Sequence, residues 1–249
     1  ETKGVVNIFN IEWRPNKYKD KSILVVGGGT STLDVNWEDI EYDYLWTCND
    51  FYLEERVLNK DIDLYFLSHT TPFNDVLTNK LKGSDTLVFY EPYHYRQKQE
   101  SEEFINFQKD TGINIFGIDI PFHDNLNVEG RKAGVTGRLI QLAMYTDASK
   151  IYFVGFDGFN KEFSNRHAFT KHVGLKESDL RRDWKNEYYE VFVEAYCYLV
   201  NIGGFQRLQN LGEGFDYNLG TEISKKYFPL DEKTLEILGK GPGGKDRRK

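Results

Sequence analysis

Short apolar segments recur along the chain and are separated by turns or by stretches with helical periodicity. They are rich in β-branched and aromatic residues, and most are continuous rather than alternating between apolar and polar positions. Continuous apolar runs of this length are typical of strands covered on both faces, as in a mainly parallel sheet. We therefore predict strands at 22–27 (SILVVG), 42–48 (YDYLWTC), 63–68 (DLYFLS), 86–90 (TLVFY), 114–118 (NIFGI), 150–155 (KIYFVG) and 205–211.

Helical periodicity fills several gaps between these strands, and we expect helices at 99–109, 138–148 and 178–201. In the last of these, apolar positions recur every three or four residues, which marks one buried stripe. Ser178 is placed to cap its start, and Gly203-Gly204 to end it. Strands that alternate with helices predict an α/β fold, namely a doubly wound, mainly parallel sheet with helices on both faces.

The length of 249 residues fits one domain of this kind. We place that domain at 1–238 and expect a lid-like loop region at about 158–180. The last segment, 239–249 (GKGPGGKDRRK), combines glycine, proline and basic residues, so we expect a flexible basic tail.

Composition excludes some classes of function. Hydrophobic residues make up 39% of the chain and aromatic residues 15%, which is enough for a sizeable core. The net charge of −7 gives no strong nucleic-acid signal, and no apolar stretch approaches the roughly 20 residues of a transmembrane segment. Cys48 and Cys197 form no C-x-x-C pair, so we expect a reducing, cytoplasmic location. The oligomeric state is left open, a homo-oligomer included.

Ligands of doubly wound sheets bind beyond the carboxyl ends of the strands, so the residues after each strand are the first candidates. Gly27-Gly28-Gly29-Thr30-Ser31-Thr32 directly follows the first predicted strand. Glycines there let backbone amides approach a phosphate, and hydroxyls add donors. The dinucleotide pattern G-x-G-x-x-G is met at Gly27 and Gly29, with Thr32 at the third position and Asp50 placed as a ribose-binding acid. A tight turn without a ligand is the alternative.

Two further turns carry groups that suit a nucleotide. Asn49 follows the second predicted strand, where its amide could bind a base or ribose, or could close an Asx turn. Arg131 and Lys132 precede Thr136-Gly137 at the start of a predicted helix, which suits a phosphate or carboxylate. A solvated basic loop is the alternative, and Arg138 fits a helix surface equally well.

A third group follows the strand at 150–155. Asp157 could hold a ribose, a metal ion or a histidine, or could cap a turn. His167 and His172 lie in a polar segment, where an imidazole could act as a general base near neutral pH or could simply face solvent. The histidines show no zinc-binding spacing.

In their order along the chain, ILVVGGGTSTL, WTCNDFYLEE and KIYFVGFDGF resemble the bacterial sialyltransferase family that uses CMP-sialic acid. That family has a G-x-G-x-S-type turn, a Cys-Asn pair followed by Phe-Tyr, an Arg with a Ser/Thr-Gly turn before a helix, and a strand ending in Gly-x-Asp. The resemblance covers roughly residues 22–160. The matching positions are Gly27, Gly29 and Ser31; Cys48, Asn49, Phe51 and Tyr52; Arg131, Thr136 and Gly137; and Gly155 and Asp157.

This resemblance implies a Rossmann-like fold and transfer of a sugar from a nucleotide-sugar donor, for which a CMP-sugar is the first candidate. It implies that Arg131 contacts the anionic groups of the donor, and that His167 or His172 is the general base. The implied nucleotide-binding residues are Gly27, Gly28, Gly29, Thr30, Ser31, Asn49, His69, Lys132, Thr136, Gly137 and Asp157.

We expect this transfer to need neither a metal ion nor a cofactor, with a glycan or another hydroxyl compound as the acceptor. Many other glycosyltransferases hold a divalent ion with a D-x-D pair, and here that spacing occurs only at Asp61-Ile62-Asp63, which leads into a strand. Stabilisation of the leaving phosphate would then fall to backbone amides and to Arg131 or Lys132.

Three other interpretations stay open. The skeleton also resembles the 6-hydroxymethylpterin pyrophosphokinase-like proteins, in which a Gly-x-Asp strand is followed by a His-Ala pair such as His167-Ala168. That resemblance implies a diphosphotransferase using ATP and Mg²⁺. The other two are an NAD-binding oxidoreductase, based on Gly27, Gly29 and Asp50, and a non-catalytic nucleotide-binding module.

Overall fold

The computed structural model describes residues 5–7, 16–29, 31–67, 73–119, 135–144, 146–156 and 207–212. Within them, eight strands form one sheet, and every pairing between neighbours is parallel. The strands are β1 Val5–Asn7, β2 Ser22–Val26, β3 Tyr44–Cys48, β4 Leu64–Leu67, β5 Leu87–Tyr90, β6 Ile115–Asp119, β7 Lys150–Val154 and β8 Leu208–Asn210. The predicted parallel α/β sheet is therefore confirmed.

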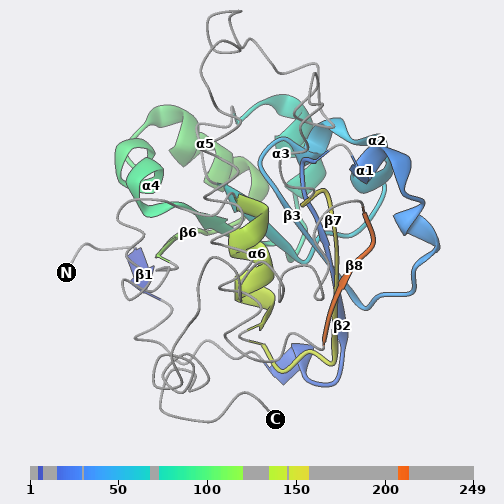
Figure 1. Cartoon of the computed structure of the whole chain (residues 1–249). Helices are drawn as coiled ribbons and strands as arrows, with labels where there is room; N and C mark the ends of the chain where they lie inside the picture. The colour runs from blue at the N-terminus through green and yellow to red at the C-terminus, as the bar shows by residue number, and fades with distance from the viewer. Residues whose placement is uncertain are drawn as a thin grey trace, which may run out of the picture.

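The order of the strands reverses once beside β2. From β2 the chain builds outward through β3, β4, β5 and β6, and then returns to place β7 on the other side of β2 (Figure 1). The full order across the sheet is β1-β6-β5-β4-β3-β2-β7-β8. The return passes through helix α6 (Val135–Met144), which contacts β2, β3, β4 and β7.

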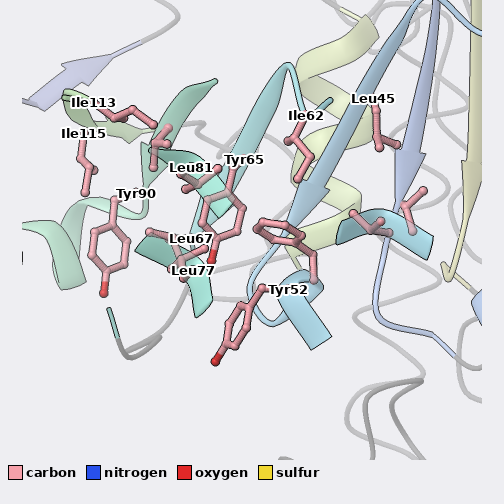
Figure 2. Close-up of a cluster of buried hydrophobic side chains, with 14 of the residues drawn as sticks. Leu45, Tyr52, Ile62, Tyr65, Leu67, Leu77, Leu81, Tyr90, Ile113 and Ile115 are labelled. Carbon is pink, nitrogen blue, oxygen red and sulfur yellow. The ribbon is translucent and has the colours of Figure 1, made fainter. Parts of the chain in front are cut away.

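Both faces of the sheet are covered, because alternate residues of each strand point to opposite sides. Ile23 and Val25 of β2 pack with α6, whereas Leu24 and Val26 pack into the core on the opposite face. That second core contains side chains from α3 (Asp75–Leu81) and α5 (Glu102–Thr111), and Figure 2 shows part of it. Such two-sided burial explains the continuous apolar runs in the sequence.

The remaining helices are short. They are α1 Ser31–Asp34, α2 Glu55–Leu58 and α4 Pro92–Lys98, with 3₁₀ turns η1 Asn16–Tyr18, η2 Trp37–Asp39 and η3 Phe51–Leu53. None of the helices in the described part of the chain is long and apolar enough to cross a membrane.

The predicted helix at 99–109 begins and ends slightly later, as α5. Ser101 Oγ accepts from the Phe104 amide at 3.3 Å, and Gly112, with φ 77°, ends the helix in the left-handed region. The helix predicted at 138–148 begins and ends earlier, as α6, and beyond it Thr146 Oγ1 donates to the Ala143 carbonyl at 2.6 Å. The predicted helix at 178–201, the lid-like region and the tail lie outside the described residues.

Asp63 ties together the segments at the amino end of the sheet, directly before β4. Its carboxylate accepts from Tyr18 Oη at 2.5 Å, from Trp46 Nε1 at 3.1 Å and from Lys17 Nζ at 2.6 Å. Tyr18 and Trp46 are fully buried. Burial first, and the negative charge of Asp63 second, raise the pKa of Tyr18, so its hydroxyl stays protonated and donates.

We expect Asp63→Asn to lower the free energy of unfolding by about 1–3 kcal/mol, because the bonds from Tyr18 and Trp46 to Oδ2 lose their charged acceptor and an amide NH₂ group replaces the Oδ1 atom that accepts from Lys17. Urea unfolding followed by circular dichroism measures the change. Asp61→Asn is the matched control, since Asp61 is exposed and lies two residues away. Equal midpoints for the two variants would contradict the role given to Asp63.

Candidate functional site

The reversal of strand order marks the carboxyl ends of β2 and β7 as a candidate ligand site. At a topological switch point, the connections from two neighbouring strands run to opposite sides and leave room for a ligand beyond their carboxyl ends. Here the two strands are β2, which continues into Gly27, and β7, which continues into Gly155. The end of β3 and the start of α6 lie beside them.

Gly27 and Gly155 bring the ends of β2 and β7 into direct backbone contact. The Gly27 amide donates to the Val154 carbonyl at 2.9 Å, and the Gly29 amide donates to the Gly155 carbonyl at 3.0 Å. A Cβ atom on Gly27 would lie 2.8 Å from the Gly155 oxygen, and one on Gly155 would lie 2.5 Å from the Gly27 oxygen. Gly155 also has φ 74°, so both its space and its conformation require glycine.

Two hydroxyls complete this contact. Ser31 Oγ accepts from the Gly155 amide at 3.0 Å, and Thr32 Oγ1 donates to the Gly27 carbonyl at 2.8 Å. The amides of Gly27 and Gly29 therefore already have protein acceptors, which differs from their expected part in approaching a phosphate. Gly27 serves the close packing of the strands and Gly29 joins their ends through its amide, whereas nucleotide binding by Gly27, Gly28, Gly29 and Ser31 stays a prediction.

Arg56, from α2, fixes the short helix α1 that follows the glycine turn. Its guanidinium donates to the carbonyls of Thr32 and Val35, and it lies over the ring of Trp37 with 5.0 Å between Cζ and the ring centroid. The Glu54 carboxylate accepts a hydrogen bond from Arg56 Nε at 2.8 Å. Burial favours a neutral Glu54, but the hydrogen bonds from Arg56 outweigh it and lower the pKa of that carboxyl. The glycine turn is thus fixed by Gly155 at its own residues and by Arg56 at the helix that follows it.

The first turn of α6 lies against the ends of β2 and β3. Thr136 is 7% exposed, its Cγ2 would lie 2.6 Å from a Cβ on Gly27, and its Oγ1 lies 3.9 Å from Cys48 Sγ. The first turn of a helix carries backbone N–H groups that have no acceptor within the helix, and the helix dipole favours negative charge there. This end of α6 can therefore bind an anion.

Asn49 follows β3 in the left-handed backbone region, with φ 46°. Its backbone amide donates to the Phe66 carbonyl at 3.0 Å, and its backbone carbonyl accepts from Tyr65 Oη at 2.6 Å. Both partners belong to β4, so the neighbouring strand fixes the backbone of Asn49 on both sides. Cys48, the residue before it, links this position to Thr136.

The structure thus brings together the glycine turn, Asn49 and Thr136-Gly137, which are far apart in the sequence. The other predicted site residues lie outside the described part of the chain: Thr30, His69, Arg131, Lys132, Asp157, His167 and His172. Arg138 is only 8% exposed, so the alternative that places it on a helix surface is wrong. Neither Arg56 nor Tyr65 could be given a site role from the sequence, because the carbonyls that they bind belong to other segments.

One group of aromatic residues has a packing role around α5. Phe73 packs on Phe107 and Phe104, with ring centroids 4.6 and 5.6 Å apart, and the Tyr95 ring lies 5.7 Å from Phe104. These aromatic residues pack together around α5. Among the described residues, no group of three or more His, Cys, Asp or Glu could hold a metal ion. Metal-independent chemistry stays a prediction.

Comparisons with known proteins give distant structural likenesses only. No model of a protein family matches the chain, and no curated protein matches it either. Among solved structures, the chain is similar to sialyltransferase CstII from Campylobacter jejuni in complex with cytidine-5'-monophosphate, at 14% identity and a TM-score of 0.47, over 81% of this chain and 87% of that chain. It is also similar to the monofunctional alpha-2,3-sialyltransferase Cst-I from Campylobacter jejuni, at 16% identity and a TM-score of 0.49, over 86% and 82%. Identities this low transfer neither an activity nor a residue's role to this chain.

The contact between Gly27 and Gly155 predicts a large cost for any side chain there. Gly155→Ala should lower the free energy of unfolding by about 2 kcal/mol more than Gly83→Ala, because both glycines have positive φ but only Gly155 has backbone within reach of a Cβ. Gly83 has nothing within 4 Å of that position. Denaturant unfolding of the two variants gives the difference, and equal destabilisation would refute the tight contact.

Cys48 should resist alkylation in the folded protein. It is 3% exposed, and burial raises its pKa to about 12, so almost no thiolate forms at pH 8. We expect iodoacetamide at pH 8 to leave Cys48 unmodified until urea unfolds the chain, as read by peptide mass spectrometry. Modification of the folded protein at the rate of the unfolded chain would show that the site is open.

Proposed function

We propose that this protein is a nucleotide-sugar-dependent glycosyltransferase, sialyltransferase-like, that binds the nucleotide of a CMP-sugar at the carboxyl edge of β2, β3 and β7. The observation that carries the proposal is spatial. Three motifs that the sequence assigns to nucleotide binding meet at the switch point of the sheet, namely the turn at 27–31, Asn49 and the start of α6. Open parallel sheets bind ligands at this place.

The chemistry of these groups suits a nucleotide. The N-terminal turn of α6 favours a phosphate, and Arg131 and Lys132 precede that turn in the sequence. In the proposed reaction these groups stabilise the negative charge that develops on the phosphate oxygen as its bond to the sugar breaks. Asn49, with both a donor and an acceptor on its side chain, suits the base or ribose.

The proposed acceptor is a hydroxyl group of a glycan or another compound. Its oxygen forms the new bond to the anomeric carbon of the sugar, and His167 or His172 takes up its proton as general base. The nucleoside monophosphate leaves with the electron pair of the broken bond. No metal ion is needed in this scheme, because helix N–H groups and cationic side chains meet the charge.

The NAD alternative fits the described geometry less well. In the dinucleotide pattern, the second glycine lets the backbone approach a pyrophosphate at the start of the next helix. Here the Gly29 amide is already bonded to Gly155, and α1 is only four residues long. Thr32, at the third glycine position, is fully buried against these glycines.

A non-catalytic module would differ from the proposal in keeping its biological role after His167→Ala and His172→Ala.

A thermal-shift panel with CMP, CDP, UDP, GDP, ATP and NAD tests this function, each with EDTA and with Mg²⁺. We expect CMP to raise the melting temperature by a few degrees in EDTA, since a ligand at about a hundred times its dissociation constant adds about 2.7 kcal/mol. Stabilisation only by ATP with Mg²⁺, or only by NAD, would refute the proposal in favour of the matching alternative.

Asn49→Asp supplies the site-specific arm of this panel. It keeps a side chain that tolerates positive φ but replaces the amide donor with a negative charge, so CMP should bind about tenfold more weakly or worse. Asn59→Asp is the control, because Asn59 is exposed at the end of α2 and the same substitution there should leave CMP binding unchanged.

A further inference from the structure

We propose that Tyr65 is a positioning residue for the nucleotide site, and that its hydroxyl holds the backbone of Asn49 in the conformation that binding requires. This inference rests on the proposed function. It assigns a role to a core residue of β4 that carries no candidate chemistry of its own.

The hydroxyl of Tyr65 acts across strands. Tyr65 stands opposite Thr47 in the register of β3 and β4, yet its Oη donates to the carbonyl of Asn49, two residues further along, at 2.6 Å. Its side chain therefore extends toward the carboxyl edge of the sheet, where the candidate site lies. Because β4 also accepts the Asn49 amide through the Phe66 carbonyl, both peptide groups of Asn49 are held by one strand.

The conformation that is held here needs support. Asn49 has φ 46°, a region that only glycine and, to a lesser degree, asparagine and aspartate enter readily. A hydrogen bond that exists only in this conformation shifts the population of the turn toward it. The direction of the Asn49 side chain is set by that backbone, so the Tyr65 hydroxyl acts on the ligand through Asn49.

Tyr65 is itself rigid, so the hydroxyl acts as a fixed point. It is fully buried, and its ring lies edge-to-face against Phe51 with 4.6 Å between the ring centroids. Phe51 belongs to η3, the turn that follows Asn49. One side chain of β4 thus supports the loop after β3 on both sides of Asp50, through the carbonyl of Asn49 and through the ring of Phe51.

Tyr65→Phe removes the hydroxyl and keeps the ring. Loss of one hydrogen bond that favours the binding conformation predicts CMP binding about 2- to 10-fold weaker than in the wild-type protein. Isothermal titration calorimetry with CMP gives the dissociation constants. Hydrogen–deuterium exchange of the peptide that contains Asn49 gives a second readout. We expect faster exchange, because the hydrogen bond from the Asn49 backbone amide to the Phe66 carbonyl is weakened when Asn49 is no longer held by Tyr65.

Tyr90→Phe is the matched control. Tyr90 lies on the neighbouring strand β5 in the same core, is equally buried, and extends in the same direction as Tyr65 in Figure 2, but β4 separates its strand from β3, which Asn49 follows. It should lose some stability while it keeps wild-type CMP affinity and wild-type exchange around Asn49.

The outcomes separate this inference from the function on which it rests. Weaker CMP binding and faster exchange in Tyr65→Phe alone support the positioning role. Wild-type affinity in Tyr65→Phe, or an equal loss in both variants, overturns that role and leaves the proposed function intact. Failure of the wild-type protein to bind CMP overturns the proposed function, and the positioning role with it.

Discussion

Direct backbone contact between Gly27 and Gly155 sets the geometry of the whole carboxyl edge. β2 and β7 are neighbouring parallel strands, and without side chains at these two positions their ends can touch. The Gly29 amide and the Ser31 hydroxyl then bond to Gly155 from the same turn. With this contact in place, Thr136 can pack on Gly27, which brings the start of α6 to the same edge.

In this arrangement some residues hold the backbone in place and others offer polar groups to a ligand. The amides of Gly27 and Gly29 are used in structural bonds, and Arg56 fixes the helix that follows the turn. The turn thus forms a firm wall, and Asn49 and the first turn of α6 supply the polar groups beside it. Rigid support of this kind keeps the groups of a site in place before a ligand arrives, which lowers the entropy lost on binding.

The sheet could be predicted from the sequence because burial on both faces leaves continuous apolar runs. β1 escaped prediction, since three residues give no recognisable pattern, and α3 did so because only Leu77 and Leu81 of its seven residues are buried. The glycine turn and Asn49 were found from their position after strands. Their actual bonds were not predictable, because the acceptor of the Gly29 amide is the carbonyl of Gly155, directly after β7, and the donor to the Asn49 carbonyl lies in β4. Such long-range partners are set by strand order, which the sequence does not show.

The central claim is that a nucleotide binds at the switch point between β2 and β7. A crystal structure of the protein saturated with CMP tests it most directly. We expect the nucleotide beside the turn at 27–31, with its phosphate at the first turn of α6 and its base or ribose at Asn49. CMP bound elsewhere on the protein, with the carboxyl ends of β2 and β7 empty, would contradict this binding site.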